Sequence, residues 1–132
     1  MKQILIVVCA LVLIFSLHFV QASFLTKTKD ILVSKITNLE ECIEENSGLD
    51  KIQERGKEIQ DLWYKKEMWL GVLCNHDAID EIRENISNIQ RYILLYNEDD
   101  DIKLDILLEC NILKQRIKEV VNNEKLQLTN VL

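Results

Sequence analysis

Trp63, Trp69, His76 and Asp80 are the residues whose types and spacing could support chemistry. Two indole rings near an imidazole could line a binding pocket, and the four-residue step from His76 to Asp80 places both side chains on one face of a helix. The alternative is structural, because aromatic rings dominate core packing and a histidine near a helix start can bond to a neighbouring carboxylate. We favour the structural interpretation and keep the four residues as a candidate binding site.

Neither a metal centre nor a catalytic site is expected around these residues. A zinc-type site needs three or four ligands, and the only other histidine, His18, lies in the apolar N-terminal segment. Cys74 is two residues from His76, so the two side chains would point to different sides of a helix and could not form a nucleophile pair. The three glycines are isolated, which excludes a glycine-rich phosphate loop. The sequence predicts no enzyme, no cofactor and no metal.

The charge balance excludes further classes of function. The 132 residues include 22 acidic and 16 basic ones, for a net charge of −6. Without a basic stripe to displace counterions from phosphates, nucleic acid is not expected as a partner. The run Glu98-Asp99-Asp100-Asp101 lacks the ligand alternation and the glycine of a calcium loop, so we interpret it as a solvated helix start.

An apolar segment opens the chain, and no charge occurs in the 24 residues between Lys2 and Lys27. At ~1.5 Å per helical residue this gap reaches about 36 Å, enough for a hydrocarbon core of ~30 Å. We expect residues 1–24 to be a signal anchor or a signal peptide, the latter cut after Ala22. A first core helix of a globular protein is disfavoured, because the segment has no polar face.

The remainder, residues 25–132, is expected outside the cytoplasm of a single-pass cell-membrane protein. Lys27, Lys29 and Lys35 follow the segment and Lys2 precedes it, so the positive-inside rule does not favour this orientation. Cleavage after Ala22 would instead release a secreted helical factor.

After residue 26 the apolar residues recur at helical spacing, which predicts an all-α fold. Breaks are expected at Asn46-Ser47-Gly48, where Gly48 suits a left-handed cap, at the helix start Asn75, and at residues 97–101. Short connections make neighbouring helices antiparallel, so we expect a three- or four-helix bundle. Its most regular coiled-coil-like seam comprises Ile79, Ile82, Ile86, Ile89, Ile93 and Tyr96.

The last helix is expected to end at Asn122-Asn123 and to leave an apolar tail. Its seam comprises Ile106, Cys110, Leu113, Ile117 and Val120, and its buried face is widened by Leu104, Leu107, Leu108 and Ile112. We expect the tail to pack on the bundle or on a partner, because Leu126, Leu128, Val131 and Leu132 are too apolar to remain solvated.

Three cysteines lie outside the apolar segment, namely Cys42, Cys74 and Cys110. In an up-and-down bundle their levels differ by at least about eight residues, or ~12 Å, whereas a disulfide needs Cα atoms within ~7 Å. We therefore predict three free, mostly buried thiols, with intermolecular pairing through Cys42 as the alternative.

Trp63, Trp69, His76, Asp80 and Ile82 at these spacings, together with the ending Glu124–Leu132, resemble an uncharacterised bacterial family. It is domain-of-unknown-function family four-three-six-three. The resemblance extends over nearly the whole chain; it implies an N-terminal membrane helix followed by a helical remainder, and it implies no activity. The sequence departs from the family pattern by lacking a proline before the tail and by carrying several cysteines.

Together these features predict a membrane-anchored helical bundle of the bacterial envelope that acts as an interaction or structural module. The long seams and the acidic surface suit self-association or a protein partner. The alternative is a ligand-binding or sensory module that uses the Trp63, Trp69, His76 and Asp80 region. A pocket between Trp69 and His76 with unpaired polar groups would favour binding, and a filled core would favour the structural role.

Overall fold

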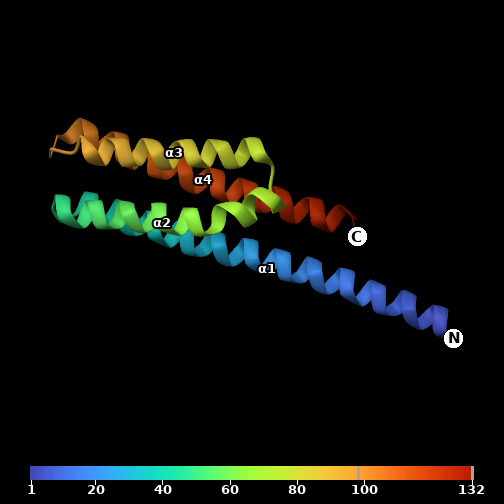
Figure 1. Cartoon of the computed structure of the whole chain (residues 1–132). Helices are drawn as coiled ribbons and strands as arrows, with labels where there is room; N and C mark the ends of the chain where they lie inside the picture. Colours follow the sequence, from blue (N-terminus) through green and yellow to red (C-terminus); the bar gives the residue numbers. More distant parts are fainter. Residues whose placement is uncertain (98, 132) are drawn as a thin grey trace.

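The computed structural model describes residues 1–97 and 99–131, with side chains as far as Gln127. These residues form four helices and no strand: α1 (Lys2–Glu44), α2 (Leu49–Leu73), α3 (His76–Leu94) and α4 (Asp100–Val131). The helices run up and down, with α1 and α3 each packed against both α2 and α4 (Figure 1). The prediction of an antiparallel all-α bundle is confirmed. The bundle has four helices, because the second half of α1 packs as one of them.

The core is built from one inward stripe of each helix. All six predicted seam positions are buried, five of them in α3 and Tyr96 just after it, and each large side chain removed from water contributes about 1.5–3 kcal/mol. The other buried apolar residues are Leu25, Leu32, Ile36, Leu39 and Ile43 of α1, Ile52, Ile59, Trp63 and Leu70 of α2, Cys74 of the following turn, and Ile106, Cys110, Leu113, Ile117 and Val121 of α4.

The first half of α1 is exposed, whereas its second half packs into the bundle. Its apolar residues from Ile4 to Val20 are exposed, and its first buried residue is Leu25. Figure 1 shows this first half extending alone beyond the bundle, at the end where the α2–α3 turn and the C-terminus also lie. By length and composition, α1 is a helix that can cross a membrane. The predicted boundary between residues 24 and 25 thus falls inside one unbroken helix.

The turn between α1 and α2 differs from the prediction in its residues. The left-handed residue that ends α1 is Asn46, with φ of 53°, where Gly48 was predicted. The N–H of Asn46 donates to the Ile43 carbonyl and that of Ser47 to the Cys42 carbonyl, which is a Schellman motif. Gly48, with φ of 96°, is instead the residue that precedes α2.

The start of α3 is as predicted. Asn75 caps the helix, and its side-chain oxygen accepts a hydrogen bond from the Asp77 N–H at 2.8 Å. The cap satisfies one of the N–H groups that have no partner within the helix.

The predicted end of the last helix is wrong, because α4 continues through Asn122-Asn123 to Val131. Buried Val121 packs the helical turn around Asn122 against the bundle, and asparagine does not by itself stop a helix. Leu126 is exposed, and the side chains of Leu128 and Val131, together with all of Leu132, lie outside the described residues.

The buried face of α4 is narrower than predicted. Leu104 and Leu108 are exposed, while Val121 is buried where Val120 was predicted. The reason is helical phase: Ile106 and Cys110 point inward, so residues two positions away from them point outward.

The four cysteines are free, and Cys74 and Cys110 are buried as predicted. Cys42 lies beside Arg55 of α2, about where the helix lengths place it. The predicted level of Cys110 is wrong: the pairs Lys114–Glu40 and Lys103–Asn46 show that, on antiparallel α1 and α4, Cys110 lies close to the level of Cys42. The two thiols point in different directions. Cys42 faces Arg55, whereas Cys110 is fully buried in the core.

Candidate functional site

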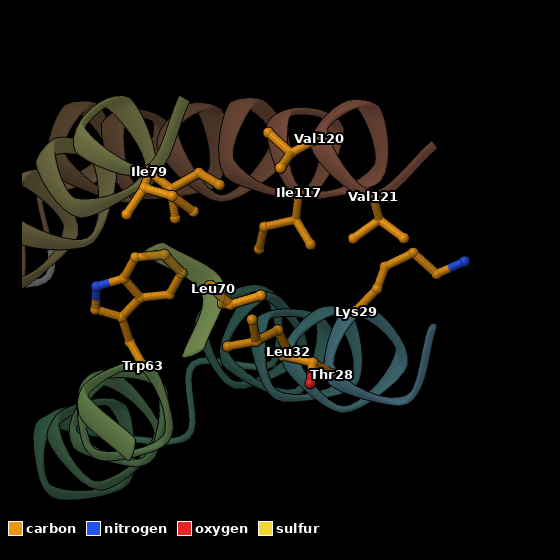
Figure 2. Close-up of a pocket in the computed structure, with 10 residues that line it drawn as sticks. Thr28, Lys29, Leu32, Trp63, Leu70, Ile79, Ile117, Val120 and Val121 are labelled. Carbon is orange, nitrogen blue, oxygen red and sulfur yellow. The ribbon is translucent and has the colours of Figure 1, made fainter. Parts of the chain in front are cut away.

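Trp63 lies in the centre of the bundle and is 1% exposed. The cavity beside it has a volume of about 10 Å³ and an apolar lining that includes Leu32, Leu70, Ile79 and Ile117 (Figure 2). A small-molecule pocket is typically ~300–1,000 Å³, whereas ~10–15 Å³ accommodates about one water. The region is therefore filled by its own side chains, as the structural interpretation of Trp63 expects.

The indole nitrogen of Trp63 is buried without a hydrogen-bond partner among the described residues. In Figure 2 it lies on the side of the ring away from Leu70 and Thr28. An unpaired indole N–H costs some stability, but it does not point into the cavity and so does not create a polar anchor there.

Trp69, only six residues later, lies at the surface and is 57% exposed. With Val72 and Leu73 of α2 and Val20, Gln21 and Phe24 of α1 it lines an apolar groove of about 360 Å³, the Trp69 groove. Lys66 lies over the ring of Phe24, with Nζ 5.3 Å from the ring centroid. The groove lies where the free half of α1 enters the bundle.

His76 and Asp80 are both exposed at the start of α3. The Asp80 carboxylate pairs with Arg83 at 2.7 Å, and Arg83 also pairs with Glu67 of α2. No hydrogen bond between His76 and Asp80 occurs in the described part of the chain. Because Trp63 is inside and Asp80 is held by Arg83, the structure does not gather the four candidate residues into one described pocket. A binding role for them stays a prediction.

A polar cluster around the buried Asn85 joins α3 to α4, and it was not predicted from the sequence. Asn85 is 3% exposed, its amide donates to the Glu109 carboxylate at 2.6 Å, and its oxygen accepts from Arg116. Arg116 also donates to the Glu81 carbonyl at 3.3 Å. The sequence feature that could have revealed this cluster is the polar Asn85 directly before seam residue Ile86. Such a cluster favours one register of α3 on α4, because sliding either helix would leave buried groups unpaired.

Gly56 marks a close approach of α2 to α3. Its carbonyl accepts a hydrogen bond from the Gln90 side chain at 2.7 Å, and an added Cβ would lie 2.5 Å from Ile93 Cδ1. The absence of a side chain at Gly56 therefore lets α2 and α3 approach closely at this point.

Charged pairs join α1 to its neighbours. Glu58 of α2 accepts hydrogen bonds from Lys35 at 3.4 Å and Arg55 at 3.0 Å. Partial burial opposes ionisation of Glu58, but the hydrogen bonds from Arg55 and Lys35 and their positive charges lower its pKa on balance. Glu40 pairs with Lys114 on the other side of α1.

The two buried thiols are poor nucleophiles. Burial raises the pKa of Cys74 to about 11, with a further contribution from Glu124. Burial, with Glu40 and Glu109, raises the pKa of Cys110 to about 12. Both remain protonated near neutral pH, and the thiolate is the reactive and metal-binding form. Among the residues that the structure describes, no three His, Cys, Asp or Glu side chains converge on a common point.

Comparison with known proteins identifies the family. The family model described as Domain of unknown function (DUF4363) matches residues 19–131, which leaves most of the exposed apolar segment outside the match. No significant match was found among curated proteins or among solved structures. The match covers all four packed helical regions and confirms the resemblance in the sequence. The chain therefore belongs to the family Domain of unknown function (DUF4363).

Proposed function

We propose that this protein is a non-enzymatic interaction or structural module, anchored in the cell membrane by the first half of α1, with its bundle outside the cytoplasm. The observation that supports the proposal is the division of α1, which is apolar and exposed through Val20 and part of the core from Leu25. A long apolar surface that the chain leaves uncovered needs a partner, and a bilayer matches its length.

Continuity of the helix supports a structural role. Because α1 is unbroken from Lys2 to Glu44, an anchored first half would transmit its position and tilt to the bundle directly. The packing of α2 and α4 against the second half, with charged pairs on both sides, makes this connection stiff. The orientation rests on the signal-like start of the chain and not on the distribution of lysines.

A protein partner or a second copy is proposed for the end of the bundle far from the span. Leu94 and Leu95 at the end of α3 and Leu104 and Leu108 near the start of α4 are exposed there. Single exposed apolar residues are ordinary, but four leucines on two helices that meet at one turn favour an interaction surface.

Fractionation and protease accessibility test the proposal. The full chain should stay with carbonate-washed membranes and keep its N-terminus, and protease added to intact cells should digest the bundle. Val12→Lys should weaken anchoring, because a lysine at the centre of a span costs about 2.5–3.5 kcal/mol, whereas Leu104→Lys should not. A soluble species that starts at Ser23 would contradict the anchor, and protection of the bundle until lysis would contradict the orientation.

A further inference from the structure

The length of the free part of α1 determines how close the bundle lies to a bilayer. The exposed apolar stretch Ile4–Val20 has 17 residues. At ~1.5 Å per residue it reaches about 25 Å, which is less than a hydrocarbon core of ~30 Å. A core of ~30 Å needs about 20 helical residues, so α1 must also use the three uncharged residues that follow Val20, namely Gln21, Ala22 and Ser23.

Those following residues already belong to the bundle. Gln21 and Phe24 line the Trp69 groove together with residues at the end of α2. Trp69 is 57% exposed and Val72 is 75% exposed, so the groove has an apolar outer edge at this level. A span that includes residues 21–23 therefore brings the Trp69 groove, with Trp69 and Val72, to the bilayer surface.

Trp69 and Lys66 at this level are residue types that suit a membrane interface. Tryptophan is enriched where hydrocarbon meets headgroups, and lysine can place its stem in apolar surroundings while its ammonium reaches water. Lys66 lies over Phe24 at the edge of the groove. The C-terminal end of α4 lies at the same end of the bundle (Figure 1), and no charged residue follows Lys125 in it.

We infer that the Trp69 groove is a lipid contact, filled by the glycerol and upper acyl region of phospholipids in the leaflet next to the bundle. The inference rests on the proposed membrane anchoring and extends it. The bundle sits directly on the bilayer with Trp69 and Val72 embedded, and it is not held away from the bilayer on a stalk.

Depth-dependent quenching of tryptophan emission tests the inference. The full chain is placed in phosphatidylcholine vesicles whose acyl chains carry bromine either near the glycerol or near the chain ends. The Trp69 signal is the difference between the wild type and Trp69→Phe, which retains only buried Trp63. Trp63 lies about 9 Å further from the span at ~1.5 Å per residue and is the internal control.

Bromine near the glycerol should reduce the Trp69 emission at least about twofold and more than bromine near the chain ends, because tryptophan resides at the interface. The emission of Trp69→Phe should change little with either lipid. If the chain floats with the vesicles and the Trp69 emission is equal with and without bromine, the lipid contact is overturned and the anchor stands. If the chain does not float with the vesicles, the anchor itself is refuted, and the lipid contact with it.

Discussion

Replacing Gly56 with alanine tests how closely α2 approaches α3. The new methyl group would lie 2.5 Å from Ile93 Cδ1 and 3.5 Å from the Gln90 amide. Helix propensity favours alanine over glycine by about 1 kcal/mol, whereas forcing a methyl group into a packed core costs about 1–3 kcal/mol. The free energy of unfolding should therefore fall by up to about 2 kcal/mol, even though alanine is the better helix former.

Gly71→Ala is the matched control, because Gly71 lies in the same helix and a Cβ there would meet nothing within 4 Å. Its substitution should raise the free energy of unfolding by up to about 1 kcal/mol. The propensity terms cancel in the comparison, so the difference between the two variants should equal the packing cost of about 1–3 kcal/mol.

Urea unfolding of the full chain in detergent micelles, followed by far-UV circular dichroism, measures both variants. Adding Ile93→Val to Gly56→Ala removes the clashing Cδ1 and should restore part of the loss, as a positive coupling in a double-mutant cycle. If Gly56→Ala is as stable as Gly71→Ala, the close approach of the two helices is refuted.

Three further predictions follow from the polar and ionisable groups. Asn85→Leu should lower the free energy of unfolding by about 1–3 kcal/mol in the same assay, because it removes the hydrogen bonds of buried Asn85 to the charged Glu109 and Arg116, whereas the exposed Asn111→Leu should not. Alkylation at pH ~8 should be slow at Cys74 and Cys110, whose pKa values are about 11 and about 12, and all thiols should react after denaturation; an internal disulfide in the monomer would contradict this. Because its folded-state pKa is lowered, Glu58 stabilises the fold above its unfolded pKa and loses this contribution as pH falls through the folded pKa. Glu58→Gln should therefore show a shallower acid-induced loss of stability than the wild type, and equal slopes would contradict the assigned role.

The α3 region shows which structural features short-range sequence patterns can predict. The steps of three and four from Ile79 to Tyr96 and the cap at Asn75 depend on residues within one or two turns, and the structure has both as predicted. The roles of Asn85 and Gly56 were not predictable in this way, because their partners Glu109 and Gln90 are 24 and 34 residues away.

The sequence by itself determined the helical class, the antiparallel order and the apolar N-terminal segment, because these follow from composition, short connections and spacing along the chain. The family was predicted from a resemblance and confirmed by the family match. Only the tertiary structure decided that α1 is shared between the exposed segment and the core, and that Trp63 is buried while Trp69 lies at the surface. It also decided that Leu104 and Leu108 face outward. The physical reason is that burial depends on the rotation and register of each helix against its neighbours, which distant side chains set together.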